Sequence, residues 1–301
     1  MASPASNWVS GFNSYSNRLW LAMAALMLAG CSRPAATDRW KEVHSFACQL
    51  QNLEPGHPPV ADLLITDPTH DGRSPLTPEE MSRLKASSPL VLGYLSLGEA
   101  ENYRDYWQKG WKPGRPAWLG PTNPDWGGNY KVRYWEPAWH EIVLKSAVGI
   151  QQQGFDGLFL DVVDGWEFWQ TSHPQARAEM IALIGQLAQQ TRRSRPDFGI
   201  FLNGGDGLLA DQDLLKSITG VVKEEIFFGL DGDGRPTPRD FTQACQARLQ
   251  PAVQAGKLVL SIDYTNDPRQ KRQARARARE AGYLEFIGTR NLDRIPEQPT
   301  D

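Results

Sequence analysis

The stretch GFDGLFLDV, at residues 154–162, joins a glycine-bounded turn to a short apolar run that contains Asp161 near its end. A run of this length and composition is typical of a buried β-strand. Leu158 and Leu160 share one face of that strand, because successive side chains point to opposite sides. Phe159 and Asp161 share the other face. The strand therefore carries a carboxylate near its carboxyl end, beside apolar side chains.

Seven further β-rich runs repeat along the chain, with helix-like segments between them. The eight runs lie at residues 46–51, 62–67, 90–96, 157–162, 198–203, 221–228, 258–264 and 284–288. Helices are predicted to begin after Thr77 and to cover 137–153, 174–193 and 240–255. Alternating strands and helices favour a parallel sheet with crossover helices. The count and size predict an α/β protein with one (β/α)8 barrel of the TIM type over residues 44–292.

An open, doubly wound sheet would show the same alternation of strands and helices. No glycine-rich phosphate loop follows the first run, which argues against a dinucleotide-binding fold. The same absence after the last two runs argues against a phosphate-dependent barrel enzyme. The barrel is therefore the preferred prediction.

Polar side chains end several of the predicted strands. In a barrel the carboxyl ends of the strands surround the catalytic mouth, and alternate side chains face the interior. The pattern of the third run predicts that Tyr94 and Ser96 face inward, and that of the fifth run predicts the same for Asn203. These residues are candidates for the site.

The seventh run is predicted in the same way. Leu258, Leu260 and Ile262 share one face, which we expect to contact the surrounding helices. Ser261 and Asp263 would then point into the barrel. This parity makes Asp263 a further acidic candidate at the mouth.

Asp161 and Glu224 are candidates for a catalytic pair. Glycoside hydrolysis commonly uses one carboxylic acid to protonate the leaving oxygen and a second carboxylate as nucleophile or base. The sixth run leaves open whether Glu224 or Glu225 faces the mouth. We assign Glu224 as the general acid, because repulsion from Glu225 would raise its pKa. Asp161 is then the nucleophile or base, and the expected outcome is retention of the anomeric configuration.

Most of the tryptophans lie in one part of the chain. Eight of the eleven lie between Trp107 and Trp169. Trp135 and Trp139 are spaced as neighbours on one helix face, so they are expected to pack inward. For some of the others we expect contact with a ligand, since indole rings offer flat apolar faces to sugars.

Several motifs resemble those of a known family. They are YLSLGEAENYR at residues 94–104, GFDGLFLD at 154–161, NGG at 203–205, GVVKEE at 220–225 and SIDY at 261–264. Together they resemble glycoside hydrolase family 114, the endo-α-1,4-polygalactosaminidases. The resemblance implies a barrel, hydrolysis of galactosamine-containing polysaccharide, and a catalytic pair at Asp161 and Glu224.

The expected substrate contacts gather at the ends of the strands. They are Asp67, Tyr94, Ser96, Glu99, Arg104, Asp164, Trp166, Asn203, Asp263 and Tyr264. Many of these side chains are acidic, so the mouth would repel an acidic polysaccharide and attract a glycan that carries free amines. No histidine-rich or alternating-aspartate loop indicates a metal site, and no cofactor is expected.

The N-terminal residues have the pattern of an export signal. Arg18 precedes an apolar run at 19–29, which is too short to span a bilayer. LAGC at residues 28–31 is similar to a bacterial lipobox, which implies lipidation of Cys31. We therefore expect a signal peptide at 1–30, a tether at 31–43, and attachment to the membrane through lipid. Ser32 favours the outer membrane of a bacterial envelope.

The remaining features limit other functions. The net charge of −3 argues against a nucleic-acid partner, and the basic run at 269–280 is expected to be a solvated helix face. Cys48 and Cys245 are expected to be two buried thiols. A monomer with a short tail at 293–301 is predicted. The competing function is a non-catalytic, carbohydrate-binding envelope lipoprotein on the same barrel.

Overall fold

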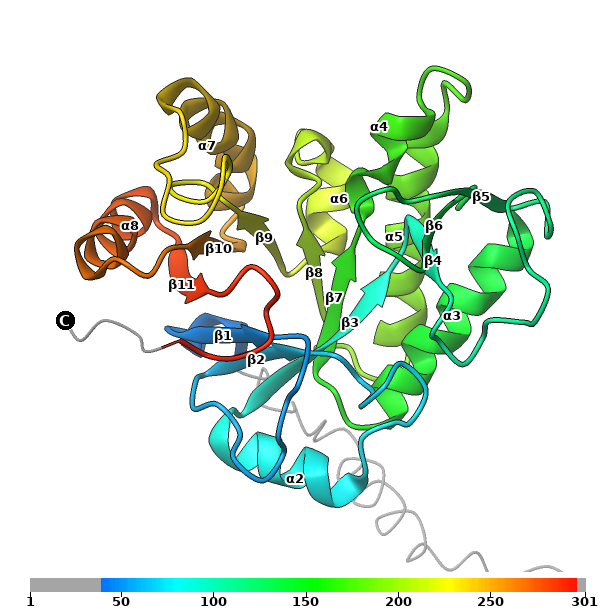
Figure 1. The fold of residues 1–301 in the computed structure, drawn as a ribbon, viewed down its shortest axis with the longest axis horizontal. Helices are drawn as coiled ribbons and strands as arrows, with labels where there is room; N and C mark the ends of the chain where they lie inside the picture. The colour runs from blue at the N-terminus through cyan, green and yellow to red at the C-terminus, as the bar shows by residue number, and fades with distance from the viewer. Residues whose placement is uncertain (1–38, 297–301) are drawn as a thin grey trace, which may run out of the picture. The chain divides into compact units, whose positions relative to one another are not determined.

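The computed structural model describes residues 39–296, and in these an eight-stranded parallel sheet curves into a nearly closed barrel (Figure 1). In sheet order the strands are β1 (Phe46–Gln49), β2 (Leu63–Thr66), β3 (Leu90–Ser96), β7 (Gly157–Asp161), β8 (Gly199–Asn203), β9 (Gly220–Glu224), β10 (Leu258–Tyr264) and β11 (Leu284–Gly288). Every neighbouring pair is parallel. The predicted TIM-like α/β fold is confirmed.

The barrel has one seam, between β1 and β11. These strands lie side by side without a hydrogen-bond ladder between them. The seam is filled by Phe46 and Phe286, whose ring centroids are 5.7 Å apart. Beyond the strands, the carbonyl oxygen of Leu292 accepts from the backbone N–H of Leu50, at 2.8 Å. Ring packing and this backbone hydrogen bond therefore close the barrel where β1 and β11 form no ladder.

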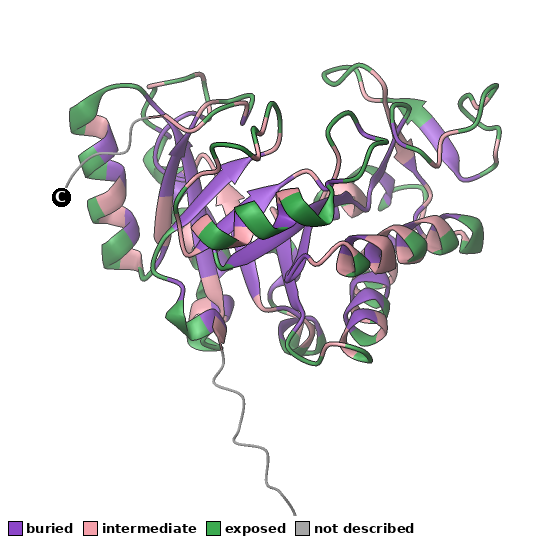
Figure 2. Cartoon of the chain, turned by 90° about the horizontal axis from the view of Figure 1, so that it is seen from below, coloured by how far each residue is buried: buried purple, intermediate pink, exposed green. Residues whose placement is uncertain are grey.

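Helices cover the outside of the strands, with buried faces toward the sheet and exposed faces outward (Figures 1 and 2). They are α2 (Pro78–Ser87), α3 (Pro137–Gln152), α4 (Trp166–Trp169), α5 (Ala176–Arg192), α6 (Gln212–Ser217), α7 (Arg239–Gln254) and α8 (Pro268–Ala281). Short 3-10 turns lie at η1 (Arg39–Glu42), η2 (Val163–Gly165) and η3 (Asp206–Leu208). The β1–β2 connection has no helix. None of the described helices is long and apolar enough to cross a bilayer.

A small antiparallel sheet, which the sequence did not predict, lies between β3 and α3. It consists of β4 (Glu99–Glu101), β5 (Leu119–Thr122) and β6 (Asn129–Val132), in the order β4-β6-β5. Glu99 and Glu101 are almost fully buried, although strands rich in carboxylates are unusual. This insertion adds side chains to one side of the barrel mouth.

Most of the tryptophan cluster is structural, which corrects the expectation of several sugar contacts. Trp107, Trp111, Trp118 and Trp139 pack in succession, with ring centroids 4.9 to 5.3 Å apart. Trp139 is buried on α3, as predicted, whereas Trp135 precedes α3, is partly buried and stacks on His173 at 4.0 Å. Trp126 differs, because it is 53% exposed. The indoles form the inner layer that supports the inserted sheet.

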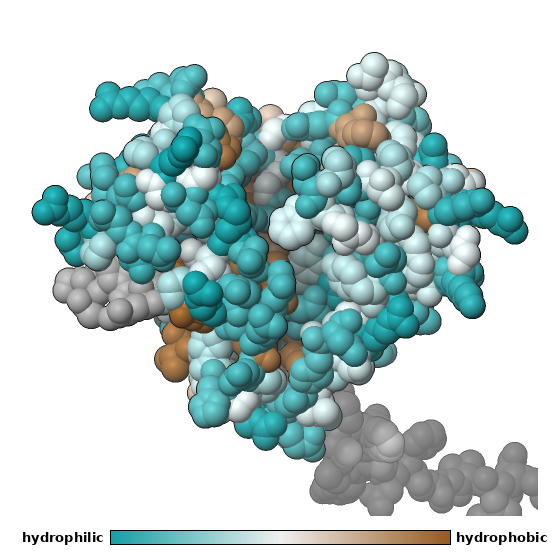
Figure 3. Space-filling view, in the orientation of Figure 1, coloured by the Kyte–Doolittle hydropathy of each residue, from teal (hydrophilic) through white to brown (hydrophobic). Residues whose placement is uncertain are grey.

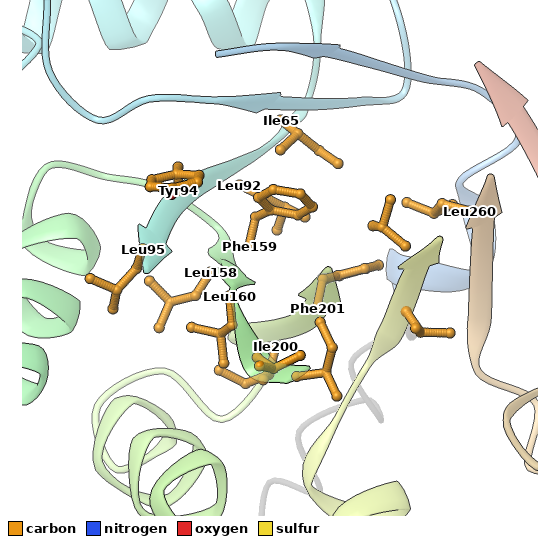
Figure 4. Close-up of a cluster of buried hydrophobic side chains, with 14 of the residues drawn as sticks. Ile65, Leu92, Tyr94, Leu95, Leu158, Phe159, Leu160, Ile200, Phe201 and Leu260 are labelled. Carbon is orange, nitrogen blue, oxygen red and sulfur yellow. The ribbon is translucent and has the colours of Figure 1, made fainter. Parts of the chain in front are cut away.

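The predicted parity holds for the third to fifth strands. Phe159 pairs in register with Tyr94 on one side and with Phe201 on the other, and all three lie inside the barrel. Figure 4 shows Phe159 with Ile65 in the interior, whereas Leu158, Leu160 and Ile200 lie on the helix side.

The predicted parity is wrong for β10. Register places Leu260 beside Val222 and Ile262 beside Glu224, so these residues share the interior side. Ser261 and Asp263 therefore face the helix layer. The sequence pattern misled because this part of the outer layer is polar, and α8 supplies arginines there in place of apolar side chains.

Trp40, in the segment predicted to be a tether, packs against the barrel. It is buried, with its ring 5.3 Å from Phe201 and its indole N–H donating to the carbonyl of Asp197. Residues from Trp40 onward form one compact unit. Cys48 and Cys245 are both buried and free, as predicted. The signal peptide, Cys31 and the first part of the tether lie outside the described residues.

Asp156, in the stretch that defines the fourth strand, holds the opposite end of the barrel together. It is 2% exposed and forms ion pairs with Lys85 at 3.1 Å and Arg195 at 3.0 Å. It also accepts the backbone N–H of Val91 at 3.0 Å. One carboxylate thus connects α2, β3 and the segment that follows α5.

We expect Asp156→Ala to lower the free energy of unfolding by about 3 kcal/mol, because it leaves buried donors without an acceptor. Urea denaturation followed by circular dichroism measures this change. Asp125→Ala, at an exposed aspartate, is the control and should change stability by less than about 0.5 kcal/mol. Equal effects of the two substitutions would contradict this role of Asp156.

Candidate active site

A cavity of about 920 Å³ opens at the carboxyl ends of the barrel strands. Nine of the predicted site residues line it: Asp67, Tyr94, Glu99, Arg104, Asp161, Asp164, Asn203, Glu224 and Tyr264. The face shown in Figure 3 is mostly hydrophilic, with small apolar patches. The structure thus brings together side chains that the sequence separates by almost two hundred residues.

Three neighbouring strands place the central polar groups. Asp161 ends β7, Asn203 ends β8 and Glu224 ends β9. The side-chain N–H groups of Asn203 donate to Asp161 Oδ1 and to Glu224 Oε1, each at 2.9 Å. One amide therefore connects the two carboxylates across the barrel mouth.

Each carboxylate also accepts from a tyrosine. The hydroxyl of Tyr94 lies 2.9 Å from Asp161 Oδ2, so both oxygens of Asp161 have a donor. The hydroxyl of Tyr264 donates to Glu224 Oε2. Burial and the nearby carboxylates raise the pKa of both tyrosines, so each keeps the proton that it donates.

Burial raises the pKa of Asp161 to about 6, although the hydrogen bond from Asn203 acts in the opposite direction, and the charge of Glu224 adds to the rise. Asp161 is therefore protonated below about pH 6 and ionised above it. Only the ionised form can act as a nucleophile.

The structure separates Glu224 from Glu225, which the sequence left open. The backbone of Glu225 has a φ of 63°, and its carboxylate pairs with Arg290 at 2.6 Å. Arg290 also lies over the ring of Tyr264, 4.8 Å from its centroid. The charge of Glu225 is therefore balanced by Arg290, and the geometry does not support the expected repulsion between Glu225 and Glu224. Asp161 is the carboxyl of the central pair whose pKa is raised.

The acidic residues on the insertion side are largely neutralised by cations. Arg104 is buried and pairs with Asp67 at 2.8 Å and Glu101 at 2.6 Å. Lys131 pairs with Glu99 at 3.2 Å. These pairs fix the shape of the cavity wall and leave fewer free charges than the sequence suggests.

Asp164 differs from these paired acids. It lines the cavity and forms no ion pair or side-chain hydrogen bond with a described residue. Burial raises its pKa, whereas the more distant Lys223 acts in the opposite direction. With Asp161 and Glu224, it gives the cavity three carboxylates without a cationic partner among the described residues.

Three predicted contacts do not line the cavity. Ser96 is 4% exposed and its Oγ accepts the backbone N–H of Glu99, so it supports the inserted sheet. Trp166 lies on α4, with its indole nitrogen buried. Asp263 is fully buried behind the barrel wall, because β10 has the opposite parity from that predicted. All three were placed at the mouth from sequence position alone.

Several lining residues were not among the predicted contacts. The inserted sheet and its loops contribute Glu101, Tyr103, Asn123, Trp126, Asn129 and Lys131. Asn123 and Asn129 donate to the carboxylate of Glu99, at 2.9 and 3.2 Å. The pairing of these strands across a long loop left no periodic signal in the sequence. Within residues 39–296 no cluster of three possible metal ligands is present.

The chain is similar in sequence to a known family of proteins. Residues 30–301 match the model of glycoside-hydrolase family GH114. An uncharacterised protein of Deinococcus radiodurans is 37% identical over 239 residues, which cover 79% of this chain and 76% of that protein.

Two solved structures share the fold at low sequence identity. The glycoside hydrolase domain of PelA from Pseudomonas aeruginosa has a TM-score of 0.67 at 22% identity, covering 86% of this chain and 100% of that one. Aspergillus fumigatus Ega3, in a complex with galactosamine, has a TM-score of 0.60 at 19% identity, covering 84% and 94%. Because the family model spans nearly the whole chain, the protein belongs to glycoside hydrolase family GH114.

Proposed function

We propose that this glycoside hydrolase cleaves α-1,4-linked, galactosamine-containing polysaccharide, with Asp161 as nucleophile and Glu224 as general acid. The observation that carries the proposal is the amide of Asn203, which donates to both carboxylates at 2.9 Å. This bridge supports two carboxylates that are fixed at a set separation, as an acid and a nucleophile require. A site that only binds sugar would not need that separation.

The same amide supports a retaining mechanism. The two N–H bonds of an amide diverge by about 120°, so acceptors at this distance lie roughly 5 Å apart. Retaining glycosidases have carboxyl groups about 5–5.5 Å apart, whereas inverting enzymes need about 6.5–9.5 Å to admit a water molecule. The bridge leaves no such room between the two oxygens.

In this mechanism each carboxylate has a separate task. Asp161 attacks the anomeric carbon and forms a glycosyl-enzyme, while Glu224 protonates the leaving oxygen. Glu224 then removes a proton from the water that releases the sugar. Hydrogen bonds to both oxygens of Asp161 hold it in one orientation, as a nucleophile requires. Glu224 has the longer side chain, which suits proton transfer to a leaving group farther out.

The charge of the cavity supports an amino-sugar substrate. Asp164 is exposed to the cavity without a cationic partner among the described residues, and Asp161 adds a negative charge above about pH 6. Carboxylates without a cationic partner favour a protonated amine and repel a uronic acid. The galactosamine bound to Ega3 fits the same class of ligand.

We expect the purified chain from residue 32 onward to cleave partially deacetylated α-1,4-galactosaminoglycan and to release the α-anomer first. The assay is run above pH 6, where Asp161 is ionised and can act as the nucleophile. Mass spectrometry gives product sizes, and NMR of the first product gives the anomer. Fully N-acetylated polymer and polygalacturonate are the matched controls and should be cleaved far less. Binding of the deacetylated polymer without any cleavage would favour the carbohydrate-binding alternative.

A second prediction assigns the acid. Glu224→Ala should lower kcat by about 10²-fold or more, because no other group at that place can protonate the leaving oxygen. Glu225→Ala is the neighbouring control and should have a much smaller effect, since that carboxylate is paired with Arg290. With an aryl glycoside whose leaving group departs without a proton, azide should restore turnover of Glu224→Ala by attacking the glycosyl-enzyme, with a glycosyl azide of retained configuration. An azide product of inverted configuration would instead make Glu224 the nucleophile.

We also propose that the protein is anchored in the bacterial cell envelope through lipid on Cys31, at the outer membrane. The supporting observations are the apolar run at 19–29 and the lipobox-like LAGC at 28–31. Cys31→Ala should shift the protein from the membrane fraction to the soluble fraction or leave it unprocessed. Cell fractionation and mass spectrometry of the N-terminus measure both results. Soluble wild-type protein without lipid would refute the anchor.

A further inference from the structure

Two carboxyl groups that the mechanism does not use lie in the barrel wall, on the side away from the cavity. Asp263 is on β10 and Glu285 on the neighbouring β11. Register pairs Glu285 with Ser261, so Glu285 and Asp263 share the face that contacts the helices. The hydroxyl of Ser261 donates to Glu285 Oε2.

The remaining oxygens of this pair are buried without a partner. Asp263 Oδ2 and Glu285 Oε1 have no hydrogen bond from any described residue. An ionised carboxylate can only accept, so two such oxygens can bond to each other only when one of them carries a proton. Buried polar oxygens are nearly always satisfied, which favours the protonated arrangement.

The charges around the pair come from α8. The charge of Arg277 acts to lower the pKa of Asp263, and that of Arg275 acts to lower the pKa of Glu285. Burial acts more strongly in the opposite direction. It raises the pKa of Asp263 to about 6 and that of Glu285 well above its ordinary range.

Asp263 is connected to the segment that follows Glu224. Its Oδ1 accepts the backbone N–H groups of Phe227 and Phe228, each at 2.9 Å. The next residue on β10, Tyr264, donates to Glu224. Asp263 is therefore joined to Glu224 along two short routes, one through β9 and one through β10.

We propose that Asp263 and Glu285 share one proton as a carboxylic acid–carboxylate pair, and that this pair positions Glu224 from behind the barrel wall. Glu285 carries the proton, because the two backbone donors favour the ionised form of Asp263. Glu285 then donates to Asp263 Oδ2, which satisfies both unpartnered oxygens. The expected effect on turnover depends on the role proposed above for Glu224. The sharing of a proton between Asp263 and Glu285 does not depend on that role.

The shared proton gives stability a defined pH dependence. A carboxyl group whose pKa is raised by folding binds a proton more tightly in the folded chain than in the unfolded chain. The contribution of Glu285 to the free energy of unfolding is complete below the ordinary glutamate pKa of 4.5. It is lost as the pH rises through the raised pKa of Glu285. A glutamine at this position is neutral in both states and can still donate to Asp263.

Glu285→Gln should therefore melt several degrees above the wild type at pH 7.5, and the advantage should disappear near pH 4.5. Calorimetry at the two pH values measures this change. Glu141→Gln, at an exposed glutamate on α3, is the matched control and should show no such pH-dependent gain. The infrared spectrum of folded wild type at pH 7.5 should also contain a carboxylic acid band that Glu285→Gln lacks. A lower melting temperature of Glu285→Gln at both pH values, or no such band, would overturn the proposal.

The positioning role is tested by activity. Asp263→Ala leaves two buried N–H groups unpaired and should lower kcat at least tenfold with little change in KM. Asp263→Asn keeps an accepting oxygen and should recover most of that loss. Equal kcat values for wild type and a folded Asp263→Ala protein would refute the positioning role. Since melting and infrared measurements need no substrate, they test the shared proton even if the proposed substrate is wrong.

Discussion

Two like charges held close together in a buried mouth are the constraint on which the rest of this site depends. Asp161 and Glu224 would repel each other if no donor lay between them. Asn203 removes that difficulty by donating to both, and Tyr94 and Tyr264 each satisfy a further oxygen. The carboxylates can therefore remain close, and Asp161 can hold a proton below about pH 6.

The barrel makes this arrangement possible because β7, β8 and β9 are consecutive in the sheet. Parallel strands bring their carboxyl ends to one side, and the register places Asn203 between its two neighbours. Beneath the polar layer, Phe159, Phe201 and Val222 fill the interior. Their packing fixes the strands and so limits how far the two carboxylates can move apart.

Beyond this centre, the charged residues divide into two groups. Arg104, Lys131 and Arg290 neutralise the acids at the rim and fix their positions. Asp164 and the central pair line the cavity without a cationic partner among the described residues. Behind the wall, Asp263 holds the segment after Glu224 by its backbone. The acidic residues thus have three roles, which depend on their partners: some form the cavity wall, some are free to contact a ligand, and Asp263 supports the backbone after Glu224.

The sequence by itself determined the barrel, the eight strands and the place of Asp161 at the end of the fourth strand. Eight apolar runs separated by capped helices are compatible with few folds other than a barrel. Asp161 lies on a strand whose two faces differ clearly in polarity, so its direction could be predicted. Tertiary structure alone decided three other points. It reversed the faces of β10, because Arg-rich α8 accepts polar side chains where an apolar layer was expected. It paired Glu225 with Arg290, sixty-five residues later. It also folded the tryptophan-rich loop into a sheet that lines the cavity, since antiparallel pairing across a long insertion depends on contacts that local periodicity does not encode.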